Sequence, residues 1–489
     1  DWSSDVCSSD LNTIVHKNNP LGTEPIGKLL LSFSVPSIIA CLVNSVYNIV
    51  DKIFIGQGVG YLGNAATTVS FPMMTIVMAF ATLAGSGGGA YAAIKLGEKD
   101  DREANLTLNN LFTMSLIMGI SIAALGLIFL EPLLKMFGAT ETVMPYAKDY
   151  ASIVLAGVPF SVLGITMSNM ARTDGNPRLS MYGILIGAVL NTILDPLYIF
   201  IFHWGVKGAA IATITSQILS AGILCHYFWK RGNMRFQLKL MKLVPRVCKK
   251  SLTLGASSGI SQLVACAMQV VMNNSLVYYG NQSEVTGDVA LSAMGIVMKI
   301  VMILGSFCIG IGVGSQPILG FNYGAGNYKR IRTTYFKAIV YATVSISVGW
   351  LICQTMPHLI LKLFGSGNVQ FTQFAVKCMI IYLGGLFYAG FQIVSTNYFQ
   401  ATGQPFKASI LSMMRQLILL IPLLLILPRF FGLDGILYAG HVADIGSAVI
   451  VACFVIPSVK KLNRKIREAQ EHENRGLLLE NCQPADAAH

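Results

Sequence analysis

The segment LSMYGILIGAVLNTILDPLYIFIF (Leu179–Phe202) decides the fold, together with LLLSFSVPSIIACLVNSVYNIV (Leu29–Val50). Each segment has about the length of a membrane-spanning helix, which needs about 20 apolar residues. The first carries Asn191 and Asp195, and the second is followed at once by Asp51. A carboxylate at the centre of a bilayer costs about 2.5–3.5 kcal/mol. We infer that these two carboxylates form a cation or proton site.

The composition indicates an integral membrane protein. Of the 489 residues, 54% are hydrophobic and only 12% are charged, whereas soluble proteins have about 25% charged residues. The net charge of +12 does not indicate nucleic-acid binding, because the positive residues lie in loops between apolar segments. The ten cysteines have no CxxC spacing and mostly lie in apolar segments. We interpret them as packing residues rather than disulfides or metal ligands.

We expect twelve transmembrane helices and an all-α integral membrane fold. Residues 1–20 lack the basic and apolar regions of a signal peptide and are interpreted as a disordered or extraneous tail. Residues 463–489 are expected to form a polar, disordered tail. The predicted spans are about 29–50, 65–91, 106–130, 146–170, 179–202, 206–229, 251–277, 289–315, 336–362, 374–399, 407–430 and 434–457.

Basic residues predict the orientation. They concentrate in the segment 230–250, near Lys329-Arg330 and after the last span, which all fall on the N-terminal side of a twelve-span protein. The positive-inside rule then places both termini in the cytoplasm. The opposite loops are expected to carry few basic residues, namely Lys52, Lys135, Lys207, Lys362 and Arg429.

The chain repeats itself at an offset of 227 or 228 positions. LLKMFGA (Leu133–Ala139) matches ILKLFGS (Ile360–Ser366), and Gly175-Asn176-Pro177 matches Gly403-Gln404-Pro405. We therefore expect two pseudo-symmetric lobes of six helices, an N lobe over 21–229 and a C lobe over 251–462, joined by a basic cytoplasmic linker at 230–250. Parallel repeats of this kind are typical of secondary transporters and less common in channels and receptors.

The outer half of the N lobe should hold a polar cluster. The rise of 1.5 Å per residue places Asp51, Tyr150, Asn191, Asp195 and Thr213 at similar depths on different spans. Their oxygens could hold a proton or a sodium ion. Alternatively, Asp51 only caps the first helix at the membrane interface.

The remaining polar residues within the spans are candidates for a substrate cavity. Arg415 and Asp444 fall at similar depths on the last two spans, and we expect them to pair, either as a structural contact or as a gate. The predicted cavity residues are Asn44, Asn48, Gln262, Gln269, Asn273, Asn274, Gln392 and Arg415.

Several motifs resemble those of the multidrug and toxic compound extrusion (MATE) family. They are VPSIIACLVNSVYNIVDKIFIG (Val35–Gly56), RTDGNP (Arg172–Pro177), NTILDPLYI (Asn191–Ile199) and ATGQP (Ala401–Pro405). The resemblance covers residues 21–462 and is closest to the bacterial branch with an acidic residue on helix one.

The resemblance implies an antiporter of the bacterial inner membrane, not an enzyme. Such a protein exports organic cations or amphipathic drugs in exchange for protons or sodium, lies among membrane lipids, binds no nucleic acid and needs no cofactor. We expect a monomer. By motif the cation site falls on Asp51, Asn191, Asp195 and Thr213, or on Thr215 in place of Thr213, with Tyr150 beside it. The alternatives are a lipid-linked precursor flippase of the same superfamily and a membrane receptor or enzyme.

Overall fold

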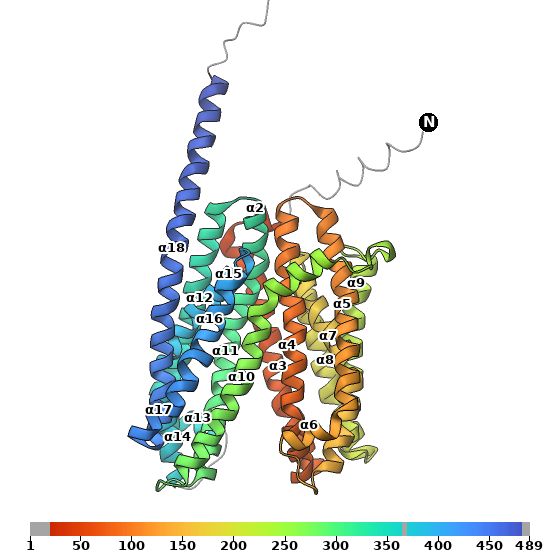
Figure 1. Ribbon diagram of the computed structural model, residues 1–489, viewed down its shortest axis with the longest axis vertical. Helices are drawn as coiled ribbons and strands as arrows, with labels where there is room; N and C mark the ends of the chain where they lie inside the picture. Colours follow the sequence, from red (N-terminus) through yellow and green to blue (C-terminus); the bar gives the residue numbers. More distant parts are fainter. Residues whose placement is uncertain (1–19, 364–368, 482–489) are drawn as a thin grey trace, which may run out of the picture.

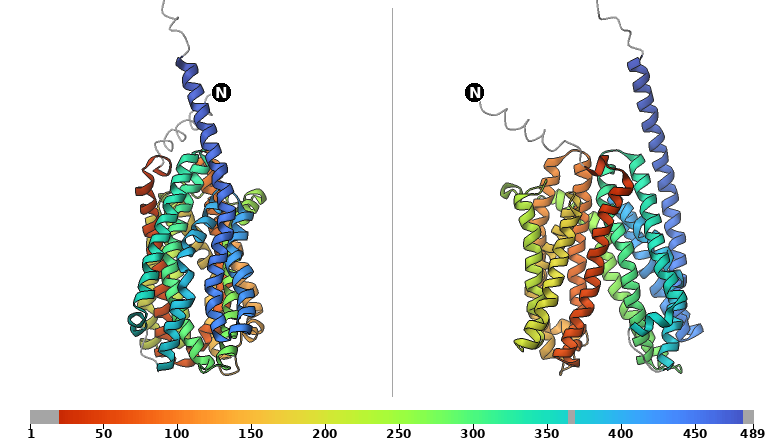
Figure 2. Two further views of the ribbon diagram at one scale, coloured as in Figure 1. Left: turned by 90° about the vertical axis from the view of Figure 1, so that its left-hand side faces the viewer. Right: turned by 180° about the vertical axis from the view of Figure 1, so that it is seen from behind.

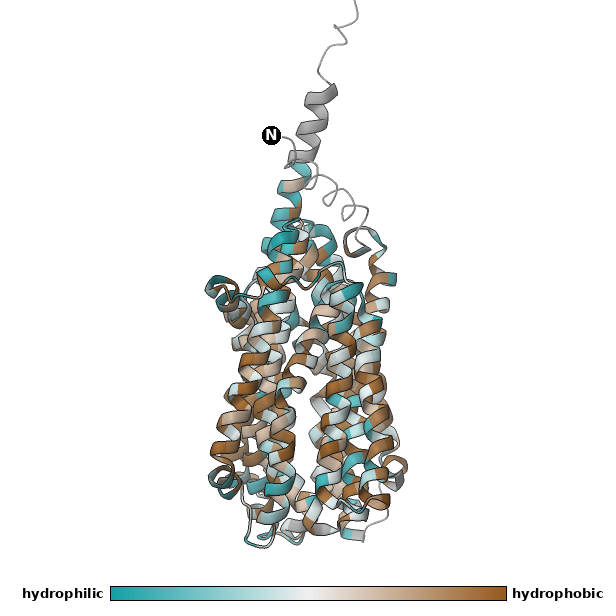
Figure 3. Ribbon diagram, turned by 90° about the vertical axis from the view of Figure 1, so that its right-hand side faces the viewer, coloured by the Kyte–Doolittle hydropathy of each residue, from teal (hydrophilic) through white to brown (hydrophobic). Residues whose placement is uncertain are grey.

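The computed structural model describes residues 20–363 and 369–481. Within these residues every regular element is a helix. Twelve helices are long and apolar enough to cross a membrane, which confirms the predicted number of spans. The middle of the long helices consists mostly of hydrophobic residues, and hydrophilic residues are more frequent toward their ends (Figure 3).

The N lobe contains the first six spans and two short helices. α2 (Pro20–Thr23) and α6 (Leu130–Met136) are the short ones. The spans are α3 (Ile26–Gly58), α4 (Tyr61–Gly97), α5 (Asp101–Ile128), α7 (Met144–Thr173), α8 (Pro177–Pro196) with the π-helix η1 (Leu197–Ile201), and α9 (Gly205–Lys230).

The C lobe repeats this plan with more interrupted helices. It begins after a linker that contains one short turn, η2 (Leu238–Leu240). Its elements are α10 (Pro245–Gly280), α11 (Gly287–Gly324), α12 (Tyr328–Thr355), α13 (Pro357–Leu363), α14 (Val369–Tyr382), η3 (Leu383–Tyr388), α15 (Ala389–Ala401), α16 (Pro405–Met413), η4 (Met414–Leu420), α17 (Ile421–Phe431) and α18 (Leu433–Asn481).

Several predicted boundaries differ from those of the structure. The tail predicted from residue 463 is helical as far as Asn481, because α18 continues beyond the last span. The ninth span ends at Thr355 and is followed by the separate helix α13, since Pro357 cannot continue the ladder of α12. The linker is shorter than 230–250, because α10 begins at Pro245. Lys52 lies inside α3 rather than in a loop. The predicted tails at 1–19 and 482–489 lie outside the described residues.

The sequence Gly175-Asn176-Pro177 shows how a tight turn joins two spans. Gly175 has φ +88°, which favours glycine. The side chain of Asn176 accepts a hydrogen bond from Leu179 N at 3.1 Å and caps α8. Pro177 occupies the first turn of that helix, where its missing N–H costs nothing. The turn therefore starts α8 at a fixed position.

The two lobes meet at one end of the molecule and separate toward the other (Figures 1 and 2). The short helix α2, the linker and the extension of α18 all lie at the end where the lobes meet (Figure 1). We call this the basic end, because the basic segments follow the spans there, and we call the opposite end the open end.

Glycines allow the lobes to approach each other near the basic end. A Cβ at Gly97 of α4 would collide with the carbonyl oxygen of Phe321, and one at Gly324 of α11 would collide with that of Ile94. Gly97 and Gly324 are 227 positions apart, as are Ile94 and Phe321. The sequence repeat is therefore present as a symmetric contact between α4 and α11.

Buried amides and hydroxyls reinforce this contact between the lobes. Gln400 Nε2 of α15 donates to Ser86 Oγ of α4 at 3.0 Å and to Ser258 Oγ of α10 at 3.2 Å. Gln316 Nε2 of α11 also lies 3.3 Å from Ser86 Oγ. Because unpaired polar groups are costly in a dry interface, this network favours the conformation in which the basic end is closed.

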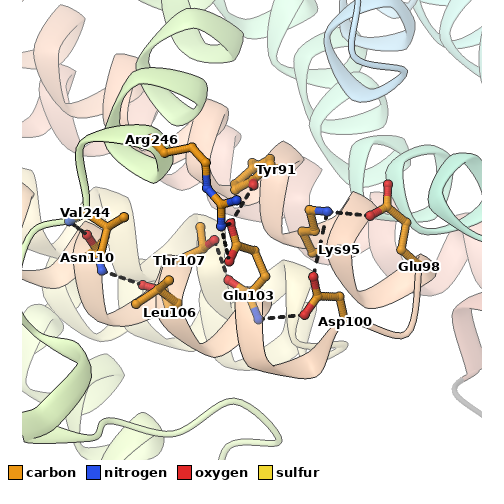
Figure 4. Close-up of polar contacts among 10 residues, drawn as sticks. All are labelled: Tyr91, Lys95, Glu98, Asp100, Glu103, Leu106, Thr107, Asn110, Val244 and Arg246. Carbon is orange, nitrogen blue, oxygen red and sulfur yellow. Dashed lines mark hydrogen bonds and ion pairs between the residues drawn. The ribbon is translucent and has the colours of Figure 1, made fainter.

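The linker is held against α5 by asparagine side chains (Figure 4 shows part of this contact). Asn109 Oδ1 accepts from Gln237 N at 2.8 Å, and Asn109 Nδ2 donates to Arg235 O at 3.1 Å. Asn110 makes the same pair of contacts with Val244 N and Leu240 O, at 2.6 and 3.2 Å. These side chains satisfy the backbone groups of an irregular segment. The linker therefore has a defined path across the N lobe.

Candidate functional site

The structure brings together the five residues that were predicted to form the cation site. Asn191 Nδ2 of α8 donates to Asp195 Oδ1 at 3.2 Å and to Thr213 Oγ1 of α9 at 3.4 Å. The carboxyl groups of Asp51, on α3, and Asp195 lie within hydrogen-bonding reach of each other. Tyr150, on α7, is near enough to interact electrostatically with both. Four helices thus meet at one polar cluster.

The local sequence explains why these side chains point inward. Asn191 and Asp195 are one helical turn apart and share a face of α8, and both are buried. Pro196 follows Asp195 and ends the regular α-helix, after which η1 is a π-helix. A π-helix of this kind is frequent at functional sites. It shifts the register of the span directly beside the carboxylate.

Asp51 does not cap a helix. It lies inside α3, which continues for two more turns to Gly58. The alternative that Asp51 only stabilises a helix end at the membrane interface is therefore wrong. Of the two candidate threonines, Thr213 contacts Asn191, whereas the hydroxyl of Thr215 donates to Ile211 O of its own helix at 2.8 Å.

Three acceptor oxygens of the cluster have no hydrogen-bond donor. They are Asp51 Oδ1, Asn191 Oδ1 and Asp195 Oδ2, and all are buried. Unpaired buried acceptors cost free energy unless something satisfies them. A proton shared between the carboxylates, or a hard cation that prefers oxygen ligands, would satisfy them.

The donor set does not suit a resident metal cofactor. In the described parts of the chain there is no group of three or more His, Cys, Asp or Glu side chains that could hold a metal ion. The cluster combines two carboxylates with an amide and hydroxyls. Oxygen donors of this kind are the ligands that hard cations prefer.

Tyr47 of α3 also belongs to the polar cluster, although it was not among the predicted site residues. Its side chain lies near Asp51 and Asp195, and its hydroxyl is within hydrogen-bonding reach of Thr213. The spacing could have revealed it, since Tyr47 precedes Asp51 by one helical turn. It adds a hydroxyl that can donate or accept a hydrogen bond within the cluster.

The proposed cavity residues are spread over both lobes. Asn48 Nδ2 donates to Asn44 O along α3 at 2.6 Å. Gln269 Nε2 donates to Asn273 Oδ1 along α10 at 2.8 Å, and Gln262 and Asn274 are on the same helix. Gln392 differs from these, because it is buried inside the C lobe. Its amide lies 3.5 Å from Leu411 O and from Ser447 Oγ.

Arg415 and Asp444 form an ion pair inside the C lobe. Arg415 Nε donates to Asp444 Oδ1 at 2.5 Å, and the side chains are 18% and 3% exposed. Arg415 belongs to the π-helix η4, and Asp444 belongs to α18. The pair neutralises both charges away from the polar cluster of the N lobe.

The sequence profile of the family described as MatE matches residues 36–197 and 262–426. The chain belongs to the MATE family. This membership places it among membrane transporters rather than enzymes. The two matched regions fall in the two lobes, in agreement with the internal repeat.

Relatives within the MATE family match nearly the whole chain. The multidrug export protein MepA of Staphylococcus haemolyticus (strain JCSC1435) is 28% identical over 444 residues, covering 89% of this chain and 94% of MepA. MepA of Staphylococcus aureus (strain MRSA252) is 27% identical over 427 residues, covering 86% and 91%.

Solved MATE structures share the fold. The MATE multidrug transporter DinF-BH superposes with a TM-score of 0.82 at 34% identity, covering 89% of this chain and 96% of its own. A MATE transporter described as outward-facing superposes with a TM-score of 0.85 at 22% identity, covering 92% and 99%. The two-lobe architecture is therefore that of the family.

Proposed function

We propose that this protein is a secondary antiporter of the bacterial inner membrane. It exports organic cations or amphipathic drugs in exchange for protons or sodium ions, and it works as a monomer among membrane lipids. The names of its relatives, multidrug export proteins, favour this function over a lipid flippase. In this proposal the basic end is cytoplasmic. Because the lobes separate toward the opposite end, the conformation is outward-facing.

The observation that carries the proposal is the buried pair Asp51 and Asp195 with its unpaired oxygens. Two carboxylates in contact within a membrane repel each other unless a cation or proton lies between them. An ion from the outside relieves this repulsion. The bound ion therefore stabilises the conformation in which α3 and α8 hold the two carboxylates closest together.

The coupling follows from differential affinity. An ion shifts the lobes from one conformation to the other only if it binds the two conformations with different strength. By linkage, an ion that favours the drug-free conformation lowers the affinity for the drug by the same factor. Binding of the ion from the outside then promotes release of the drug to the outside.

The test is transport of a fluorescent organic cation into everted membrane vesicles, whose cytoplasmic face is on the outside. A proton gradient and a sodium gradient are imposed separately, on the natural protein and on Asp51→Asn and Asp195→Asn. We expect one gradient to drive transport and both variants to lose it at normal expression. Asp149→Asn serves as the control, because Asp149 is an exposed carboxylate paired with Lys207. Full transport by both site variants would refute the assignment.

A further inference from the structure

α3 and α11 form an antiparallel seam between the lobes. Near the basic end, a Cβ at Gly314 of α11 would lie 2.8 Å from Ser34 Cα of α3. One turn outward, a Cβ at Gly310 would lie 2.6 Å from Ile38 Cα. Further outward, Ser45 and Ser306 share a hydrogen bond of 3.1 Å. The residue numbers rise on α3 as they fall on α11, so these contacts define the register of the seam.

The next facing position on each helix is a lysine. Lys52 is seven residues beyond Ser45 on α3, and Lys299 is seven residues before Ser306 on α11. Seven residues are close to two helical turns, so each lysine lies on the face that carries its serine. Both lysines are exposed. One lysine from each lobe therefore lies at the outward continuation of the seam between α3 and α11.

The nearest acid to these lysines is Asp51, which attracts Lys52 electrostatically but forms no ion pair with it. Lys52 and Lys299 are near enough to repel each other electrostatically. Neither forms an ion pair with any side chain that the structure describes. Asp51 follows a different direction on α3, where its carboxyl group lies beside Asp195. The other contact of Lys52 is with the ring of Phe71, 5.6 Å away.

The depth of Lys299 makes a purely structural role costly. It lies twelve residues from the start of α11, or about 18 Å along the helix. Charged groups at such depth mark ligand pathways in membrane proteins, because their cost must be offset by water or a partner. Two ammonium groups with three donors each, one from each lobe, match a carboxylate with two acceptor oxygens.

We propose that Lys52 and Lys299 bind the carboxylate of a zwitterionic amphiphile between the lobes, so that this transporter prefers zwitterions to the matching cations. The inference rests on the proposed export function and narrows its substrate class. Binding the carboxylate removes the repulsion between the lysines. The carboxylate also bridges α3 and α11, and so joins the two lobes through the substrate.

The test uses two rhodamine dyes that share one chromophore. Rhodamine 19 carries a free carboxylic acid, and its ethyl ester lacks that charge. Dissociation constants for both are measured by fluorescence polarisation on the purified full-length protein, on Lys52→Gln, Lys299→Gln and the double variant. We expect the natural protein to bind the acid about tenfold more tightly than the ester. Each single variant should lose most of this preference, and the double variant all of it.

The ester reports on folding, because its binding should stay within about twofold in every variant. Lys52→Arg and Lys299→Arg keep the charge and should keep the preference for the acid. Lys207→Gln is the control, since Lys207 is paired with Asp149 at the open end. An unchanged acid-to-ester ratio in the double variant overturns the proposal. Loss of acid binding on adding phosphatidylglycerol to the natural protein would assign the lysines to a lipid phosphate and would also overturn it.

Transport assays distinguish failure of the carboxylate site from failure of the antiport function. If the vesicles transport both dyes and the acid-to-ester ratio is the same in the lysine variants, antiport is supported and the carboxylate site is refuted. If neither gradient drives transport of either dye, but binding of the acid still depends on Lys52 and Lys299, the carboxylate site is supported and the antiport function is refuted.

Discussion

Arg246 Nη2 donates to both carboxylate oxygens of Glu103, at 2.9 and 3.0 Å (Figure 4). Glu103 is on α5 of the N lobe, and Arg246 is in the first turn of α10, where the C lobe begins. Tyr91 of α4 donates to the same carboxylate at 2.9 Å. The start of the C lobe is therefore fixed to the N lobe by charge as well as by the hydrogen bonds of the linker.

Removing this contact should destabilise the protein modestly. Charge-assisted hydrogen bonds contribute about 1.5–3 kcal/mol, and the 65% exposed side chain of Arg246 reduces this to about 1 kcal/mol. A double-mutant cycle of Glu103→Gln and Arg246→Gln, followed by thermal unfolding in detergent, should give a coupling of that size. Glu468→Gln should change little, because its pair with Arg464 is exposed. Zero coupling between Glu103 and Arg246 would show that the ion pair does not stabilise the fold.

The symmetric glycine contact should control which end of the molecule is open. In Gly97→Ala and Gly324→Ala the new methyl group collides with a backbone carbonyl of the other lobe, and backbone cannot give way as a side chain can. We expect both variants to favour conformations with the basic end open. Spin labels on the two lobes at the open end should then show shorter distances. Gly305→Ala is the control, because nothing lies within 4 Å of its added Cβ, and an identical shift there would exclude the explanation.

Helical spacing made much of the candidate site predictable. Asn191 and Asp195 could be placed on one face, and the alternating direction of the spans put Thr213 and Tyr150 at the same depth. The proximity of Lys52 to Lys299 could not be predicted, because it depends on how the two lobes pack against each other rather than on the period of one helix. The spacing of residues predicts which face of its own helix a side chain lies on. Contacts between the lobes also depend on how far one helix is shifted along the other, which the spacing does not give.

Other errors have different physical causes. The composition of the segment after residue 463 suggested disorder, but local pairs such as Arg464 with Glu468, at 2.9 Å, support a helix at i,i+4 spacing. The linker has an alternating apolar pattern from Met234 to Leu240, but its path is set by Asn109 and Asn110 on a distant helix. Hydrogen bonds from side chains to the backbone of a distant segment leave no pattern in the local sequence from which the path of that segment could be predicted.

Asp174 should give the stability a measurable pH dependence. Burial raises the pKa of Asp174 to about 6, although Tyr227 and the backbone N–H groups of Asn233 and Met234 oppose this shift by donating to its carboxylate. The contribution of its proton is complete below the unfolded pKa of about 4 and is lost as the pH rises through 6. By linkage it amounts to at most about 3 kcal/mol.

We therefore expect the melting temperature of the natural protein to fall between pH 5 and pH 7.5 relative to that of Asp174→Asn, which cannot titrate at this position. Scanning fluorimetry across this range measures both curves. Parallel curves would show that the ionisation of Asp174 does not differ between the folded and unfolded states.

The ion pair of Arg415 and Asp444 should behave differently when one partner or both are removed. Breaking a buried pair leaves an uncompensated charge and costs about 3–5 kcal/mol, whereas replacing both partners by apolar residues is often nearly neutral. Arg415→Met and Asp444→Leu should each lower the melting temperature strongly, and the double variant should recover most of the loss. Transport by the double variant then distinguishes a structural role of the pair from a gating role. If the double variant is stable and still exports its substrate, the pair is structural. If it is stable but no longer exports the substrate, the pair acts as a gate. A double variant no more stable than the single ones would show that the two charges do not compensate each other.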